Sequence, residues 1–139
     1  KEPKLKQVWI NVSVLRFRDE RVPDAPPEGA IEQLRGPEDQ IIVVAMRELF
    51  QERPLWLRAP LEERIMAKLG YRMNVSTTQK TLQCVSYFWS DGPFRGSYSR
   101  LGWDPRREPQ QAMLLQVIDF RDRYFRQKRV YFQAMQGGH

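Results

Sequence analysis

The sequence contains one cysteine and one histidine, and these low counts remove several classes of function at the outset. Cys84 alone cannot form an internal disulfide, and it fits a reducing compartment such as the cytosol or nucleus. Cys84 and the terminal His139 cannot build a four-ligand zinc site or a firmly held catalytic pair. We therefore expect no metal, no cofactor, no small-molecule substrate and no enzymatic activity.

Long hydrophobic runs, repeats and low-complexity tracts are also missing. No apolar stretch approaches the roughly 20 residues that span a bilayer, so we expect no membrane partner. The 139 residues, of which 41% are hydrophobic and 29% charged, suit one domain with a real core. Because the first residue is Lys1, we expect the chain to be a fragment of a longer protein.

Positive charge is plentiful, and it is unevenly placed. The chain has a formal net charge of +6. Residues 1–91 carry 14 basic and 13 acidic side chains, whereas residues 92–139 carry 9 basic and 4 acidic ones. Such a basic half is typical of a nucleic-acid or acidic-membrane partner, although a solvated basic surface fits it equally well.

Hydrophobic periodicity and turn residues predict the first elements. Alternation of Val, Ile and Trp with polar residues predicts a strand over 6–17, and prolines make 21–30 an extended connector. Apolar stripes at helical spacing predict helices over 37–52 and 60–69. A capping box at Ser76 predicts a third helix, running to about Trp89.

A hairpin is predicted after the third helix. Residues 97–103 and 113–120 have the composition of strands, and Asp104-Pro105 predicts a turn between them. Strand, three helices and hairpin follow one another in a winged helix, a helix-turn-helix with a β-hairpin wing. We predict an α+β fold: a winged helix with an extra N-terminal strand and a basic C-terminal arm. The three parts are residues 1–36, 37–121 and 122–139.

The third helix and the wing supply candidate contacts to double-stranded DNA. One helix face collects amides, hydroxyls and a lysine without any acid, which suits contacts to base edges and phosphates. Arginines in and after the wing suit phosphate contact; a solvated surface is the plain alternative. The candidates are Gln79, Lys80, Gln83, Tyr87, Arg95, Arg100, Arg106, Arg107, Arg121 and Arg123.

The aromatic residues are predicted mainly to pack. Trp89, Phe94 and Trp103 are expected to seat the wing on the helices, and Trp56 is expected to be structural too. The segment after Arg121 interleaves basic and aromatic residues. It fits either a surface helix docked by its aromatics or a nucleic-acid contact.

Four short motifs, in order and at matching spacing, resemble one family. They are Arg53-Pro54-Leu55-Trp56, Gly92-Pro93-Phe94-Arg95, Gly102-Trp103-Asp104-Pro105-Arg106 and Gln116-Val117-Ile118-Asp119-Phe120-Arg121. They are similar to the motifs of subunit 5 of RNA polymerase III transcription factor C (TFIIIC). The resemblance covers roughly residues 39–121, and it departs at Gln83, where the family tends to have a proline.

The resemblance implies a nuclear, winged-helix-like DNA-binding domain. It implies that the domain helps TFIIIC engage the A box, the internal promoter of tRNA genes, with other TFIIIC subunits as partners. One alternative is a winged helix that docks other subunits and binds DNA only non-specifically. Binding to an anionic membrane is least favoured, because the arginines do not fall on an amphipathic helix.

Overall fold

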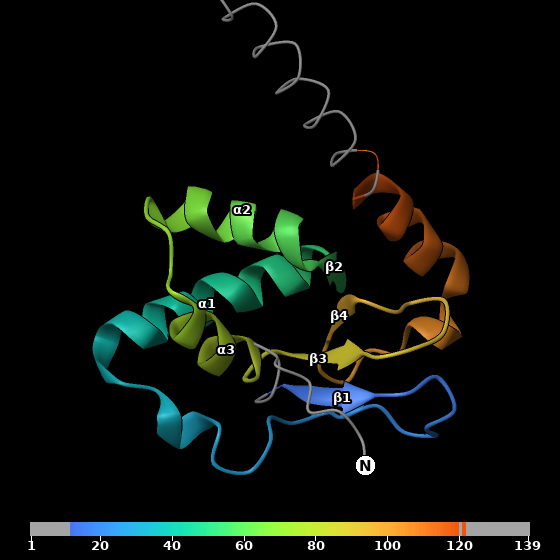
Figure 1. The fold of residues 1–139 in the computed structure, drawn as a ribbon, viewed down its shortest axis with the longest axis horizontal. Coiled ribbons are helices and arrows are strands. Elements are labelled where there is room, and N and C mark those ends of the chain that lie inside the picture. Colours follow the sequence, from blue (N-terminus) through green and yellow to red (C-terminus); the bar gives the residue numbers. More distant parts are fainter. Residues whose placement is uncertain (1–11, 120, 122–139) are drawn as a thin grey trace, which may run out of the picture.

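The computed structural model describes residues 12–119 and 121, which form a mixed α+β fold (Figure 1). A further helix, over residues 109–119, follows the labelled elements. The labelled elements are β1 (Ser13–Leu15), the 3₁₀ helix η1 (Ile31–Gln33), α1 (Gly36–Glu52), β2 (Leu55–Leu57), α2 (Arg58–Leu69), α3 (Val75–Leu82), β3 (Ser86–Trp89), β4 (Ser97–Arg100) and the 3₁₀ helix η2 (Pro105–Arg107). Over these residues no helix is long and apolar enough to cross a membrane.

The four strands form one sheet in the order β1-β3-β4-β2. Strand β1 runs parallel to β3, and the two pairings of β4, with β3 and with β2, are antiparallel. Helices α1, α2 and α3 gather on one side, and helix 109–119 lies toward the other end of the molecule (Figure 1). The N-terminal strand is therefore part of the same sheet as the β3–β4 hairpin.

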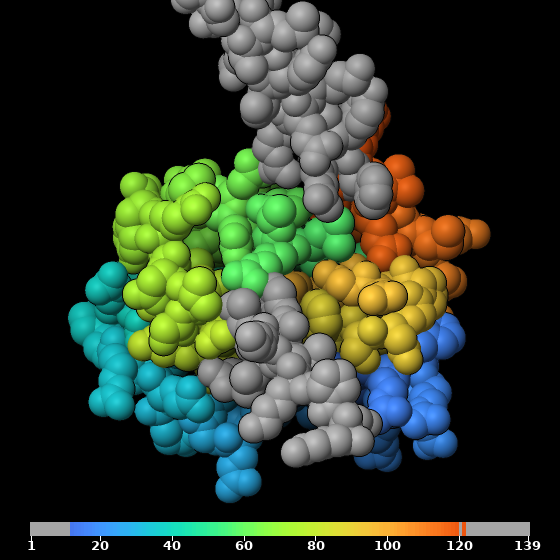
Figure 2. Space-filling model, viewed as in Figure 1, coloured from blue at the N-terminus to red at the C-terminus, as the bar shows by residue number. Residues whose placement is uncertain are grey.

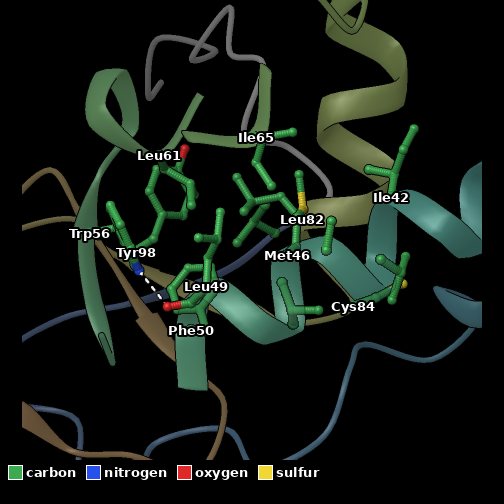
Figure 3. Close-up of a cluster of buried hydrophobic side chains, with 14 of the residues drawn as sticks. Ile42, Met46, Leu49, Phe50, Trp56, Leu61, Ile65, Leu82, Cys84 and Tyr98 are labelled. Carbon is green, nitrogen blue, oxygen red and sulfur yellow. Dashed lines mark hydrogen bonds between the residues drawn. The ribbon is translucent and has the colours of Figure 1, made fainter. Parts of the chain in front are cut away.

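One hydrophobic cluster lies between the three helices and the sheet (Figure 3). It includes Trp56, which is 1% exposed and donates a hydrogen bond from Nε1 to the carbonyl oxygen of Leu49 at 3.1 Å. Helices α1 and α2 contribute apolar residues at helical spacing: Ile42, Met46, Leu49, Leu61 and Ile65. Burial of this stripe explains why the helices form at those positions.

A second cluster, of aromatic residues, lies beneath the β3–β4 hairpin. It consists of Leu15, Leu55, Tyr87, Trp89, Phe94, Trp103 and Ala112. The Tyr87 hydroxyl donates to the carbonyl oxygen of Trp103 at 2.6 Å, and Trp89 Nε1 donates to the Ser99 hydroxyl at 2.9 Å. The expected burial of Trp89, Phe94, Trp103 and Trp56 is thus confirmed. The first three do not seat the hairpin on the three predicted helices, however, because their cluster joins it to β1, β2 and helix 109–119.

The first two predicted helices are confirmed with small shifts at their ends. Helix α1 starts one residue before Pro37, and α2 starts two residues before Pro60. Gly70 ends α2 with a left-handed backbone, φ 82°, which a residue without Cβ adopts at no steric cost.

The predicted third helix, from Ser76 to about Trp89, runs well past Leu82, where α3 ends. Helix α3 starts after Asn74, whose side-chain oxygen accepts from the backbone N–H of Thr77, and it ends at Leu82. The predicted capping box at Ser76 is therefore wrong. Residues 86–89 form β3 instead, because Tyr87 and Trp89 pack in the second cluster, Phe88 packs against the first, and their backbone pairs with both β1 and β4.

The predicted hairpin is wrong in its partners. The hairpin that forms is β3–β4, and a strand, β2, which was not predicted, adds to its outer side. Residues 113–120 were predicted as a strand, but 109–119 are helical. Ala112, Leu115 and Asp119 lie at helical spacing and face the domain, so burial favours a helix over the strand that Val117 and Ile118 indicated.

Candidate nucleic-acid interface

Helix α3 presents a short face of uncharged polar groups to the solvent. Its inner face is fixed by burial of Thr78, Thr81 and Leu82. Ser76 is exposed and Gln79 is half-buried on the outer side, and Val75, next to Ser76, is 55% exposed. Such a face can offer hydroxyl, amide and methyl groups to a ligand in the way that base edges require.

Arg72 lies in the turn just before α3 and is exposed. It makes no ion pair with any residue that the structure describes. The turn between α2 and α3 and the start of α3 border a groove of about 750 Å³, which Arg72 lines together with Met66 and Val75. Arg72 was not among the predicted residues, although its place between two predicted helices was a signal that could have found it.

Lys80, on the same helix, is turned toward the protein. Its ammonium group lies 2.7 Å from the carboxylate of Asp39, at the start of α1. The hydrogen bond from Lys80, assisted by the backbone N–H of Arg35, holds the pKa of Asp39 below its usual value. Lys80 therefore ties α3 to α1 in this arrangement.

Gln83 and Tyr87 lie inside the protein, which corrects their expected place on an exposed helix face. Gln83 is 2% exposed and its amide donates to the side-chain oxygen of Gln33 at 3.2 Å. Tyr87 is fully buried, and burial raises the pKa of its hydroxyl. The helix that would have exposed both residues ends at Leu82.

The loop between β3 and β4, residues 90–96, carries Arg95 on its surface. Gly96 N donates to the carbonyl oxygen of Trp89 at 2.9 Å, and Gln116 Nε2 donates to that of Pro93 at 3.0 Å. The loop is thus held at its base and from helix 109–119. The Arg95 side chain itself has no ion-pair partner within the described part of the chain.

Arg100 and Arg106, expected to project from the wing, are instead engaged with the protein. Arg100 donates to the carbonyl oxygen of Phe50 at 3.2 Å. Arg106 pairs with Asp104 at 3.0 Å, lies 5.2 Å from the centroid of the Trp89 ring, and donates to the backbone carbonyls of Phe17, Asp19 and Glu20, just after β1.

The pair formed by Asp104 and Arg106 is partly buried. Burial raises the pKa of Asp104, but hydrogen bonds from the Arg106 side chain and backbone outweigh it, so the net pKa lies below its ordinary value. The same pair raises the pKa of Arg106. The expectation that Arg106 points into solvent is therefore wrong, because its donors are used inside the protein.

The remaining predicted contacts lie outside the α3 face. Arg107 is exposed on η2, and Arg121 is exposed just beyond helix 109–119. Arg123, together with the rest of the predicted basic arm of residues 122–139, lies outside the described residues. The structure thus separates the predicted set into exposed groups (Gln79 in part, Arg95, Arg107, Arg121) and inward-facing ones (Lys80, Gln83, Tyr87, Arg100, Arg106).

One face of the molecule shows α3 and the 90–96 loop together (Figure 2). Atoms of α3 and the preceding turn, yellow-green, lie to one side, and those of the hairpin, gold, lie to the other. No group of three His, Cys, Asp or Glu side chains within residues 12–119 is placed to hold a metal ion.

Comparison with known proteins shows which family the chain resembles. Residues 3–121 match the family described as "Tau95: RNA polymerase III transcription factor (TF)IIIC subunit HTH domain". General transcription factor 3C polypeptide 5 of Homo sapiens is 32% identical over 117 residues, which are 81% of this chain and 21% of the human protein. Transcription factor tau subunit sfc1 of Schizosaccharomyces pombe is 33% identical over 73 residues, 52% of this chain and 15% of that protein.

A solved structure, "Sfc1-DBD", has a similar fold. Its TM-score is 0.56 at 29% identity, and the match covers 73% of this chain and 47% of that one. The chain spans about a fifth of the length of the human relative that it matches. Since the matched family region covers residues 3–121, the chain belongs to the family of the helix-turn-helix domain of RNA polymerase III transcription factor TFIIIC subunits.

Proposed function

We propose that the chain is a winged-helix DNA-binding module of a TFIIIC subunit. The order α1-β2-α2-α3-β3-β4, with a hairpin after the third helix, fits a winged helix. In this proposal α3 enters the major groove and the 90–96 loop is the wing. The name of the structural neighbour, a DNA-binding domain, supports the same assignment.

The observation that carries the proposal is the exposed face of α3. Ser76 and Gln79 offer neutral donors and acceptors there, and beside them lies the cation of Arg72, which has no ion-pair partner among the described residues. Neutral groups discriminate between bases, whereas a cation contributes phosphate affinity without sequence information. The neutral side chains and the cation lie close together in the sequence, as a helix that contacts both bases and phosphates requires.

The proposed target is the A box of tRNA genes, in the nucleus. Membership of the TFIIIC family and the resemblance to subunit 5 support this target. Other TFIIIC subunits are the proposed protein partners, and the rest of the subunit would bring them to the site.

The test is a fluorescence-anisotropy titration of an A-box duplex and a scrambled duplex at two salt concentrations. We expect tighter binding to the A box, and Gln79→Ala should narrow the difference between the duplexes. Arg72→Ala should weaken binding to both and reduce the slope of log affinity against log salt by about 0.9, since one phosphate contact is lost. Arg47→Ala is the charge-matched control, because Arg47 is exposed on α1 beside the connector, where it lines a hollow with Asp24 and Pro26.

A second candidate function rests on helix 109–119. Its outer side exposes four apolar side chains, between 39% and 60% accessible: Met113, Leu114, Val117 and Ile118. Such a stripe fits docking to another subunit. Equal, weak affinity for the two duplexes, unaffected by Gln79→Ala and Arg72→Ala, would contradict the DNA-reading function and favour this one.

A further inference from the structure

A tight turn at residues 16–19, just after β1, is joined to the 90–96 loop. Ser90 N donates to the carbonyl oxygen of Leu15 at 2.9 Å, and Phe17 N donates to the carboxylate of Asp91 at 2.7 Å. The Phe17 ring lies 6.5 Å from that of Trp89 and 6.3 Å from that of Phe94, measured between centroids. The turn and the loop are therefore positioned as one unit.

The same turn is held from within and from below. Asp19 N donates to the carbonyl oxygen of Arg16 at 3.0 Å, and the Asp19 carboxylate accepts from Arg16 N at 2.8 Å. The guanidinium of Arg106 donates to the carbonyl oxygens of Phe17, Asp19 and Glu20. An exposed turn of four residues is thus fixed by more partners than its own closure needs.

The arginine side chains of this unit are not used by these contacts. Arg16, Arg18 and Arg95 are all exposed, and none forms an ion pair with a residue that the structure describes. The carboxylates of Asp19 and Asp91 accept from backbone N–H groups rather than from these guanidiniums. The backbone of the turn and the loop is thus held in place, while the guanidinium groups of Arg16, Arg18 and Arg95 remain exposed to a ligand.

Both parts of the unit lie on the face that also shows α3. In Figure 2 the blue atoms that follow β1 adjoin the gold atoms of the hairpin, and Figure 1 shows the two loops side by side. A duplex that contacts α3 and the wing can therefore continue across the turn.

We infer that Arg16 and Arg18, with Arg95, form a two-loop clamp on the sugar–phosphate backbone of double-stranded DNA. The inference rests on the DNA-binding function proposed above and adds Arg16 and Arg18, which the sequence did not indicate, to the candidate contact Arg95. Guanidinium groups bind phosphate through paired hydrogen bonds, and a backbone fixed before binding loses less entropy. The contact carries no sequence information, so it adds affinity to any duplex.

The experiment uses the chain of residues 1–139, with the A-box and scrambled duplexes at two salt concentrations. Arg18→Ala should lower the affinity for both duplexes by up to about eightfold near 0.1 M salt and reduce the salt slope by about 0.9. Arg16→Ala should also lower the affinity for both duplexes. In both variants the ratio of A-box affinity to scrambled affinity should stay at the wild-type value. Arg18→Lys, which keeps the charge but loses the paired hydrogen bonds, should fall between wild type and Arg18→Ala.

Arg47→Ala again serves as the matched loss of one exposed arginine. If the affinity and slope of Arg16→Ala and Arg18→Ala equal those of Arg47→Ala, while the wild type binds DNA, the clamp is wrong and the role of α3 stands. If the wild type binds neither duplex, the proposed function fails first. A loss of A-box preference in Arg18→Ala would also overturn the clamp, because a backbone contact cannot cause it. Unchanged thermal melts confirm that the variants are folded.

Discussion

Two regions of the molecule carry arginines and use them in opposite ways. We call the first the seam: Arg53, Asp104, Arg106 and Asp119, which join helix 109–119 and the segment of residues 17–20 to the domain. We call the second the edge: residues 16–19 and 90–96. The arginines of the seam each have a carboxylate and several carbonyl partners, whereas those of the edge have no ion-pair partner within the described residues.

The contacts of Arg53 show what the seam does. Its guanidinium lies 4.0 Å from the centroid of the Trp56 ring and 2.7 Å from the carboxylate of Asp119, which is 1% exposed. Asp119 also accepts from the backbone N–H of Leu57 at 2.9 Å. Helix 109–119 is thereby held to β2 by charged hydrogen bonds.

All four residues of the seam belong to the motifs that revealed the family. A guanidinium that already donates to a carboxylate and to several carbonyl oxygens would have to give up these charged hydrogen bonds in order to bind phosphate, and for Arg53 this would leave the buried carboxylate of Asp119 without its partner. The seam residues of these motifs therefore hold the domain together, whereas Arg95, which lies in another of the motifs, belongs to the edge. Contacts to DNA have to be sought among arginines whose donors are free.

The largest expected effect comes from removing the Trp56 ring, against which the Arg53 guanidinium packs. Trp56→Ala removes a side chain that is 1% exposed, together with its hydrogen bond to Leu49, and should lower the free energy of unfolding by about 3–5 kcal/mol. Urea denaturation followed by fluorescence measures this change. Met66→Ala, on the exposed side of α2, is the control and should cost much less. Equal stabilities of the two variants would show that Trp56 is not part of the core.

Breaking the buried pair of the seam comes next. Asp119→Ala leaves the Arg53 charge and the N–H of Leu57 without their shared acceptor. We expect a loss of about 2–4 kcal/mol, somewhat below the usual value for a buried pair because Arg53 is 16% exposed. Asp24→Ala, an exposed acid of the connector, should leave the urea midpoint unchanged. A loss no larger than that of this control would mean that helix 109–119 is held by its apolar contacts alone.

Arg106 belongs to the seam, whereas Arg107, its neighbour in the chain, is exposed. Replacing each in turn compares a bonded arginine with an exposed one. Arg106→Ala should lower the free energy of unfolding by about 1.5–3 kcal/mol, because several charged hydrogen bonds are lost. Arg107→Ala should change it by less than about 0.5 kcal/mol, since Arg107 is exposed.

The same two arginines can also be compared in DNA binding, where the exposed Arg107 is expected to contribute and Arg106 is not. Since the donors of Arg106 face inward, the double variant of Arg106 and Arg107 should flatten the salt slope by at most about 1, the share of Arg107. A flattening of about 2 would mean that Arg106 also supports DNA binding, either by its own contact with phosphate or by holding the turn that carries Arg16 and Arg18.

The sequence was sufficient for the elements whose stability is local. Helices α1 and α2 were predicted because an apolar stripe, a proline near the start and Gly70 at the end all agree. The succession of three helices and a hairpin was found, but β2 was missed, and the second strand of the predicted hairpin lies in helix 109–119. Residues 86–89 fit helical and strand spacing alike, and only their pairing with β1 and β4, from distant parts of the chain, decides between the two.

The candidate site was harder to predict for a related reason. Whether an arginine is free depends on partners far along the chain: Arg106 bonds to residues 17–20, and Arg53 to Asp119. Composition does not reveal such partners. Arg16 and Arg18 were overlooked because they precede the predicted domain, and only the pairing of β1 with β3 brings them to the edge.

The smallest effect, and the sharpest test of the edge, compares two glycines of the 90–96 loop. Gly92 and Gly96 both have a left-handed backbone, with φ of 78° and 83°. A Cβ at Gly92 would lie 2.8 Å from Cβ of Phe17, whereas a Cβ at Gly96 would meet nothing within 4 Å. Gly96→Ala therefore measures backbone strain alone, about 1–2 kcal/mol, and Gly92→Ala adds a clash.

The clash should make Gly92→Ala less stable than Gly96→Ala by about 1–2 kcal/mol, because Phe17 is pressed away from the loop. Neither variant removes a charge. If the turn and the loop must be held together to grip the backbone, Gly92→Ala should also weaken binding to both duplexes more than Gly96→Ala does. Differential scanning calorimetry and the anisotropy titration measure the two consequences. Equal DNA affinities at unequal stabilities would mean that the arginines of the edge act singly, as separate charges on the surface.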